Sequence, residues 1–209
     1  FLTMLGMIIG VAAVILMLAI GAGVQQQVNN AIASMGSNLF IVMPGATSAN
    51  GVRTGYGGAV NLTLGDANAI KELSGVKYMA PLVQMNSQVI YGTNNWSTQV
   101  IGTNADYLGL RDWALTEGYV FDDAEMRSGA QVALVGQQIV ENLFGGESPL
   151  GETIRIRNQP FQVIGVLTSK GQSLDGRDQD DTIIVPLTTS QRRLQGSRFR
   201  DMLRMIMVQ

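Results

Sequence analysis

The chain has 209 residues, 14 of them basic and 16 acidic, so its formal net charge is −2. The absence of a basic excess argues against a nucleic-acid-binding protein, because neutralising phosphates takes clustered Lys and Arg. The absence of both His and Cys removes the usual imidazole base, the commonest zinc ligand and all thiolate chemistry. Most hydrolase and metalloenzyme classes are excluded with them, and the length allows one large or two small domains.

The charged residues are distributed unevenly, since every one of them lies from Arg53 onward. Residues 2–20 form an apolar run in which only Thr3 has a polar side chain, which is the length a helix needs to cross about 30 Å of hydrocarbon. We therefore predict a transmembrane helix. A secretory signal peptide and a buried core helix are the alternatives, although the run is long for the apolar part of a signal peptide.

The helical pattern continues beyond the apolar run. Between residues 21 and 36, apolar side chains recur every three or four positions and amide side chains lie opposite them. A helix over residues 2–35 would be about 50 Å long, well beyond the bilayer core. We expect it to leave the membrane as a stalk and to stop at Gly36.

The remainder of the chain has the pattern of a water-soluble domain of mixed helices and strands. Strands are predicted at residues 38–43, 76–90, 96–102, 130–135, 153–157, 161–167, 182–185 and 202–208, and helices at residues 63–73, at 137–144 and from Thr188 onward. Two strand–helix–strand units at the ends enclose a β-rich middle. This order predicts one α/β layer interrupted by a smaller β subdomain.

The motifs of common catalytic and cofactor sites are missing. The sequence has no P-loop and no nucleophile elbow, and the glycine-rich stretch at residues 55–58 is expected to be a loop because no strand leads from it into a helix. Without His, a serine–histidine–carboxylate triad is impossible. We therefore expect no catalytic residue, no cofactor site and no metal site in this chain.

Clusters of like charge have two possible interpretations. We interpret the acidic clusters as solvated turn carboxylates, with a cation site or a catalytic pair as alternatives; the clusters are Asp122, Asp123 and Glu125, and Asp178, Asp180 and Asp181. The basic set is interpreted as a solvated face rather than an anion site; it comprises Arg192, Arg193, Arg198, Arg200 and Arg204. Trp96 and Trp113 are expected to pack in or beside the core, not to serve as a ligand platform.

Several short motifs, in order along the whole chain, resemble those of MacB-type ABC transporter permeases in the MacB/FtsX-like permease family. They begin with the sequence LTMLGMIIGVAAVI and continue through MGSNLFIV, AQVALVG, LFG, PLG and FQVIGV to DQDD followed by VPLTT and QRRL. Each motif alone is weak, whereas their shared order is specific. The chain is similar to the first membrane helix and the extracytoplasmic core of that family.

The resemblance implies a fold of the α+β class with three parts. Residues 1–36 would form the transmembrane helix and stalk. Residues 37–92 and 181–209 would form a Porter-like subdomain, a split β-α-β layer, and residues 93–180 an inserted, β-rich Sabre-like subdomain. No part of this chain resembles the nucleotide-binding domain of that family. We therefore expect that this chain is not an ATPase.

The resemblance also implies a function in mechanical coupling. Family members sit in the bacterial inner membrane, here with residues from about 21 onward in the periplasm. They work as homodimers with a nucleotide-binding domain, a periplasmic adaptor protein and an outer-membrane channel, and carry ATP-driven helix movement into substrate export. The alternatives are a permease subunit of a lipoprotein-releasing ABC complex, or a membrane-anchored binding module.

One loop is a candidate for contact with a partner. Residues 170–181 form a polar, glycine-containing connection between two apolar strands, so they must be exposed. The family docks its adaptor where this loop returns from the middle subdomain, which makes Gln172, Asp175 and Arg177 the predicted contact residues. An ordinary solvated connection is the alternative.

Overall fold

The computed structural model describes residues 2–34, 39–45, 48–49, 52–53, 62–173, 176–195 and 202–209. The chain divides into two compact units, Phe1–Gly36 and Ser37–Gln209.

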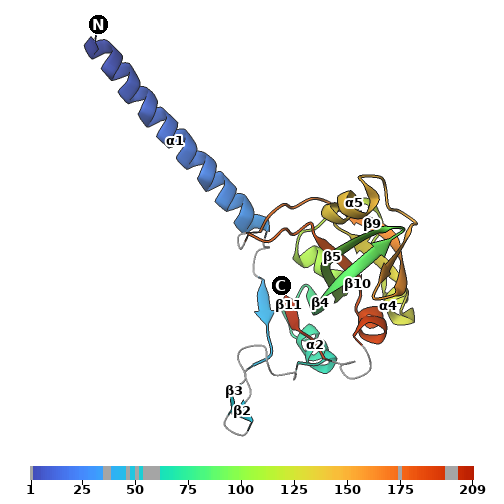
Figure 1. Ribbon diagram of the computed structural model, residues 1–209. Coiled ribbons are helices and arrows are strands. Elements are labelled where there is room, and N and C mark those ends of the chain that lie inside the picture. The colour runs from blue at the N-terminus through green and yellow to red at the C-terminus, as the bar shows by residue number, and fades with distance from the viewer. Residues whose placement is uncertain are drawn as a thin grey trace. The chain divides into compact units, whose positions relative to one another are not determined.

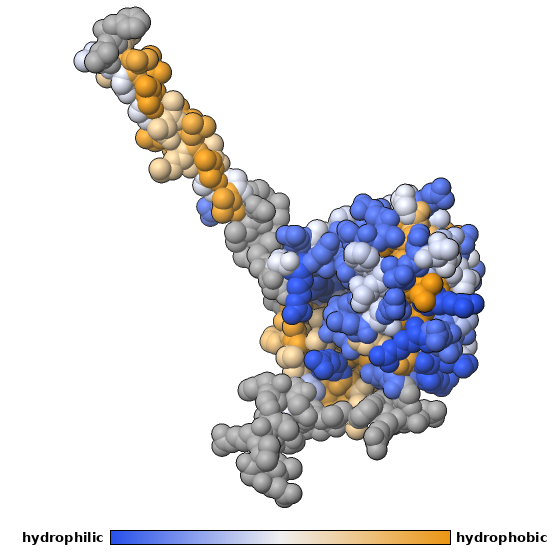
Figure 2. All heavy atoms as spheres, in the orientation of Figure 1, coloured by the Kyte–Doolittle hydropathy of each residue, from blue (hydrophilic) through white to orange (hydrophobic). Residues whose placement is uncertain are grey.

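The first unit is a single helix, α1 (Leu2–Ser34), which confirms the helix predicted from the apolar run. Its segment Thr3–Gln25 is long and apolar enough to cross a membrane, and none of that segment is buried within the chain. Figure 2 shows apolar residues along this helix, in contrast to the largely hydrophilic visible face of the second unit. The predicted stop at Gly36 lies outside the described residues.

The second unit mixes strands with short helices (Figure 1). Its helices are α2 (Leu64–Lys71), α3 (Asp106–Leu110), α4 (Asp123–Ser128), α5 (Gln137–Phe144), α6 (Leu187–Thr189) and the π-helix η1 (Ser190–Leu194). Its strands are β1 (Phe40–Val42), β2 (Ser48–Ala49), β3 (Val52–Arg53), β4 (Met79–Tyr91), β5 (Asn94–Thr103), β6 (Leu115–Gly118), β7 (Val132–Val135), β8 (Thr153–Ile156), β9 (Gln159–Leu167), β10 (Thr182–Pro186) and β11 (Met205–Val208).

Nine of the described strands form one sheet in the order β1-β11-β4-β5-β10-β7-β9-β6, and β8 pairs with both β4 and β9. Because β8 joins these two strands, the pairings β4–β5–β10–β7–β9–β8–β4 close into a ring of six strands. Strand β4 belongs to two parts of the sheet, since its first residues pair with β11 and its later residues pair with β5 and β8. The predicted Porter-like and Sabre-like parts therefore share one continuous sheet, and their division stays a prediction.

Three hydrophobic clusters fill the space around this sheet. The largest combines side chains of the ring strands with those of α5, including Val100, Ile139, Phe161 and Ile183. A second cluster contains Leu82, Trp113, Phe121 and Leu134, and a third joins α2 to β4 and β11. Apolar burial on this scale is the main stabilising term for the domain.

Local signals placed two helices correctly. Thr63 Oγ1 accepts from the backbone N–H of Asp66, and the Asp66 carboxylate accepts from the backbone N–H of Thr63, so α2 begins with a capping box. These hydrogen bonds from Thr63 hold the pKa of Asp66 below its usual value. Helix α5 has the predicted bounds and ends at Gly145, whose φ of 64° is the left-handed conformation of a helix C-cap.

Five elements were not expected: the short strands β2 and β3, helix α3, strand β6 and helix α4. Helix α4 has no buried residue, so it lacks the apolar stripe by which a helix is recognised. Strand β6 is mostly exposed, and α3 contains Gly109, a poor helix former. The final strand begins at Met205 rather than at residue 202, where Met202 forms only an isolated bridge with Thr63.

Candidate interaction surface

The predicted contact loop between β9 and β10 is a small hairpin. Gln172 forms a bridge with Asp178, and Gln179 N–H donates to the Gly171 carbonyl at 3.1 Å. Nearer the tip, Ser173 N–H donates to the Arg177 carbonyl at 2.8 Å. These bonds give a polar connection a defined backbone.

The hairpin is held at its base by the carboxylate of Asp180, which is 6% exposed. Oδ2 accepts from Ser169 Oγ at 2.5 Å and from the Gly171 N–H at 3.0 Å, and Oδ1 accepts from the Lys170 N–H at 2.7 Å. A buried carboxylate needs such partners, because desolvation without them is costly. The interpretation of Asp180 as a solvated turn carboxylate is therefore wrong.

Residues on either side of Asp180 fasten the hairpin to the rest of the domain. Arg111 Nη2 donates to Gln179 Oε1 at 2.6 Å. Trp96 Nε1 donates to Asp181 Oδ1 at 2.9 Å, so this half-buried carboxylate is also a structural acceptor. The DQDD motif thus has a structural role at the base of the hairpin.

The indole groups pack as expected. Trp113 is buried and its Nε1 donates to the Thr168 carbonyl at 2.8 Å, whereas Trp96 is half-buried against the largest cluster. Lys170 lies beside Trp113, since its Nζ is 5.8 Å from the centroid of that ring. The same Nζ donates to the Arg111 carbonyl at 2.5 Å. Burial, and then the nearby Arg111 charge, lower the pKa of Lys170.

A glycine allows the hairpin base to approach helix α5. A Cβ added at Gly136, the N-cap of that helix, would lie 2.1 Å from the Asp180 carbonyl oxygen. The Gly136 N–H also donates to the Thr182 carbonyl at 2.9 Å. The two backbones are therefore in contact at a distance that only glycine permits.

The structure describes two of the three predicted contact residues. Gln172 and Arg177 are exposed on the hairpin, whereas Asp175 lies outside the described residues. Arg177 also supplies the carbonyl that accepts from the Ser173 hydroxyl at 3.2 Å. Their contact with a partner stays a prediction. The sequence analysis did not predict that the Asp180 carboxylate holds the base of this hairpin. An acidic motif directly before a buried strand was a signal that could have indicated it.

The other acidic cluster caps a helix. Asp122 Oδ1 accepts from the Glu125 N–H at 2.8 Å, and Glu125 Oε2 accepts from the Asp122 N–H at 3.0 Å, which is a capping box for α4. The spacing of these two residues is a signal that could have predicted the helix. Asp123 is exposed, as expected. In the described part of the chain no group of three or more acidic side chains could hold a metal ion.

The basic set is only partly described. Arg192, Arg193 and Arg204 are exposed, consistent with a solvated face. Arg198 and Arg200 lie outside the described residues.

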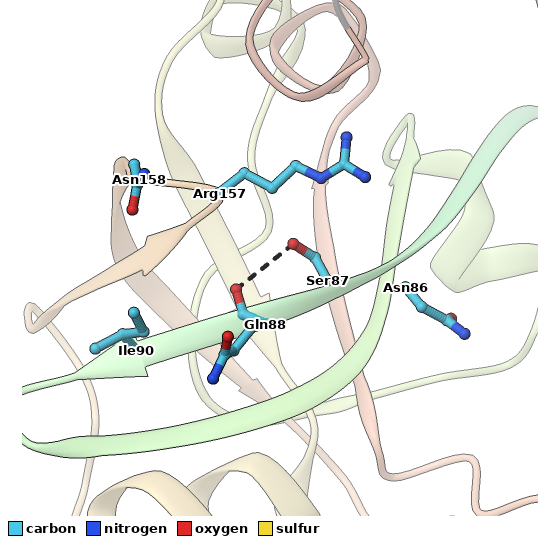
Figure 3. A pocket seen from close by; sticks show the side chains of 6 residues that line it. All are labelled: Asn86, Ser87, Gln88, Ile90, Arg157 and Asn158. Carbon is cyan, nitrogen blue, oxygen red and sulfur yellow. Dashed lines mark hydrogen bonds between the residues drawn. The ribbon is translucent and has the colours of Figure 1, made fainter.

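A polar pocket of about 320 Å³ is formed by residues that do not belong to the hairpin. It is lined by Asn86, Ser87, Gln88, Ile90, Arg157 and Asn158, from strand β4 and the turn between β8 and β9 (Figure 3). Its volume is at the lower end of the range for ligand sites.

Comparison with known proteins identifies close relatives. The model of a family described as "MacB-like periplasmic core domain" matches residues 1–209. The "Macrolide export ATP-binding/permease protein MacB" of Syntrophobacter fumaroxidans is 42% identical over 94% of this chain and 28% of its own length. The "Pyoverdine export ATP-binding/permease protein PvdT" of Pseudomonas entomophila is 40% identical over 94% of this chain and 29% of its own length.

Two solved structures share the fold. The periplasmic region of MacB from Actinobacillus actinomycetemcomitans superposes with a TM-score of 0.69 at 21% identity, covering 85% of this chain and 77% of that one. The extracellular domain of the transporter YknZ from Gram-positive bacteria gives a TM-score of 0.63 at 24% identity, covering 82% and 81%. This chain spans less than a third of the length of these two curated relatives. With a family model and relatives of this identity matching along nearly its whole length, the chain belongs to the MacB-like periplasmic core domain family of ABC transporter permeases.

Proposed function

We propose that this chain is the first membrane helix and periplasmic core of an exporter, and that it transmits movement rather than catalysing a reaction. ATP hydrolysis by a nucleotide-binding domain moves the membrane helices, and the core passes that movement to a periplasmic adaptor and an outer-membrane channel. The working unit is a homodimer in the bacterial inner membrane. Helix α1 spans the bilayer, and residues from about 21 onward lie in the periplasm.

The observation that carries this proposal is the place at which the chain coming from α1 joins the sheet of the second unit. Phe40, where the chain coming from α1 enters the sheet, is paired with Val208 next to the last residue. Strand β11 in turn pairs with β4, the long strand that both parts of the sheet share. A displacement carried by α1 would therefore be applied at the β1 edge of the sheet and reach β4 through β11.

The length of α1 supports the same role. The helix continues for nine residues beyond the apolar segment Thr3–Gln25, through residues 26–34. At 1.5 Å per residue this extension is about 14 Å long. A continuous helix resists bending, so it can move a periplasmic domain as a lever.

A same-length replacement of the stalk tests the transmission of movement. A chimera is made in which this chain takes the place of the matching segment of the Syntrophobacter fumaroxidans relative. In this chimera, residues 26–30 are replaced either by five glycines or by five alanines. Glycine is about 1 kcal/mol less favourable than alanine at each helical position. The alanine stalk therefore stays rigid, whereas the glycine stalk loses helical stability.

The readouts are ATP turnover and export of a macrolide, the compound class in that relative's name. We expect the alanine chimera to export, and the glycine chimera to hydrolyse ATP with little export. Equal export by both chimeras, with equal amounts in the membrane, would show that a rigid stalk is not needed.

We also propose that the β9–β10 hairpin contacts the adaptor through Gln172, Asp175 and Arg177. The hydrogen-bonded base keeps the hairpin in place while Gln172 and Arg177 are exposed, which suits a docking element. Replacing all three by Ala in the chimera should weaken adaptor pull-down without changing the melting temperature. Glu147→Ala with Arg155→Ala is the control, since it also removes one exposed charge of each sign, and unchanged pull-down by the hairpin variant would exclude this contact.

A further inference from the structure

One edge of strand β4 has a gap in its pairing. On the side away from β5, the ladder with β11 reaches Leu82 and the ladder with β8 begins at Val89. Between them, none of the described residues pairs with residues 84–88 on this side. Among the described residues, a stretch of this edge is therefore unpaired in the middle of a strand that is paired at both ends.

The alternation of an antiparallel ladder tells which backbone groups face this gap. Tyr91 and Asn94 are the closing pair of the two-residue β4–β5 turn, so odd-numbered residues of β4 bond to β5 and even-numbered residues face the other way. Tyr78, an even-numbered residue just before β4, confirms this, because it exchanges hydrogen bonds of 3.2 and 3.0 Å with Gln209 on the β11 side.

Gln84, Asn86 and Gln88 consequently direct their N–H and C=O groups into the gap. Among described residues, the one hydrogen bond recorded for these backbone groups is weak, from Ser87 Oγ to the Gln88 carbonyl at 3.5 Å. Asn86 and Gln88 are exposed. Unpaired backbone groups at an accessible edge are a template for an added strand.

The polar pocket described above lies at this gap. Continuing the β4–β8 register by one residue would place Arg157 opposite Gln88, but the chain turns away there, with φ of 49° at Arg157 and 64° at Asn158. The end of β8 thus leaves an open space of about 320 Å³ beside the β4 edge. Figure 3 shows the Arg157 side chain reaching from the turn toward Ser87.

The charge of the lining side chains defines what the gap attracts. Arg157 is the sole charged residue among the six that line the pocket, and three of the others carry amides. Its Nη1 donates to the Leu194 carbonyl at 2.8 Å, which uses one of the five guanidinium donors. A carboxylate is the group that matches an exposed guanidinium in both charge and geometry.

We propose that the β4 edge at residues 84–88 binds an extended acidic peptide segment of a partner protein as an added strand. Main-chain hydrogen bonds to Gln84, Asn86 and Gln88 hold the segment, and a Glu or Asp side chain of the partner pairs with Arg157. Five residues of β4 fit a segment of about the same length.

The probe is a fluorescein-labelled, amidated peptide of sequence Glu-Thr-Val-Thr-Val-Thr-Glu, in which a carboxylate reaches Arg157 whichever way the strand runs. Its matched partner has Lys in place of both Glu residues, and a third version is N-methylated at every central amide. Binding to the full chain in detergent micelles is followed by fluorescence anisotropy. We expect saturable binding of the Glu peptide, about tenfold weaker binding of the Lys peptide, and none of the methylated one.

Two variants separate charge from main-chain pairing. Arg157→Gln should reduce the preference for the Glu peptide to about twofold or less, whereas Arg155→Gln, on the same hairpin but outside the pocket, should preserve it. Asn86→Pro removes one outward N–H without touching a bond to β5, so it should prevent binding of either peptide. If this variant fails to fold, Arg157→Gln and the methylated peptide still decide the outcome.

Three results would overturn the proposal. Binding that does not saturate by about 1 mM would show that the edge is not a peptide site. Equal affinity for the Glu and Lys peptides would exclude an acidic segment. Self-association of the chain that Asn86→Pro abolishes would assign the edge to a second copy instead of a partner protein.

Discussion

Replacing Asp180 by Ala tests whether one buried carboxylate organises the β9–β10 hairpin. The substitution removes the acceptor of three hydrogen bonds, from Ser169 Oγ and from the N–H groups of Lys170 and Gly171. Asp180→Asn is the graded variant, because an amide retains one of the two acceptor oxygens.

The expected loss follows from those three donors. A donor deprived of its partner costs about 1–3 kcal/mol, and the lower value applies here because Ser169 is exposed and Lys170 and Gly171 are half-buried, so water can replace the carboxylate. Asp180→Ala should therefore destabilise the domain by about 3 kcal/mol. For a domain of this size, that corresponds to a fall in Tm of about 6–12 °C, and Asp180→Asn should cause about half of it.

Thermal unfolding of the full chain in detergent, followed by circular dichroism, measures the effect. Asp178→Ala is the matched control, since Asp178 is exposed and its carboxylate accepts one bond of 2.9 Å, from the Asp180 N–H. Amide hydrogen exchange at Lys170 and Gly171 should accelerate in the Asp180 variants only. If Asp180→Ala and Asp178→Ala unfold at the same temperature, the carboxylate does not anchor the hairpin.

Three further predictions concern other parts of the chain. Gly136→Ala should cost about 3 kcal/mol in urea unfolding because its Cβ overlaps a backbone carbonyl, whereas Gly145→Ala, with φ of 64° and open space around it, should cost about 1 kcal/mol; equal costs would contradict the close approach. Thr63→Ala removes the hydroxyl but keeps the backbone N–H, so it should raise the pKa of Asp66 part of the way back toward 3.8 in a carboxyl-carbon NMR titration; the stabilising contribution of this carboxylate, present above pH 3.8 and lost as pH falls through its lowered pKa, should shrink, and an unchanged titration would refute the Thr63 side chain as its cause. Val11→Arg should disfavour membrane insertion by about 2.5–3.5 kcal/mol in a microsomal insertion assay, and insertion equal to that of the parent chain would contradict a membrane-spanning α1.

Elements defined by local signals could be predicted closely from the sequence. Helix α5 was placed at its observed bounds because its apolar residues recur at helical spacing and Gly145 ends it. Around the turn between β8 and β9, the first strand was predicted to end at residue 157 and the second to begin at residue 161, whereas β8 ends at Ile156 and β9 begins at Gln159, since Pro160 does not end the strand pairing. Helix α1 needs no partner to be recognised, because 23 consecutive residues from Thr3 to Gln25 are long and apolar enough to cross a membrane.

Elements that lack a local apolar pattern escaped prediction. The residues of α4 are all at least partly exposed, so its signals are limited to the capping pair Asp122 and Glu125 and the terminal glycine Gly129. Asp180 lies in a polar segment like any solvated loop. Its burial depends on Ser169 and on backbone groups about ten residues away, which sequence spacing does not place around it.

The sequence by itself determined the membrane-like helix, the succession of strands and helices, and the family, because apolar periodicity, turn residues and short motifs are local properties of the chain. Tertiary structure alone decided which strands are neighbours: β10 inserts between β5 and β7, and β8 joins β4 to β9 to close the ring. Within the described part of the chain, β4 is unpaired between Leu82 and Val89 because β11 ends its ladder at the first of these residues and β8 begins its own at the second. Strand pairing joins residues far apart in the chain, and its register depends on how whole faces bury against one another, which no single segment encodes.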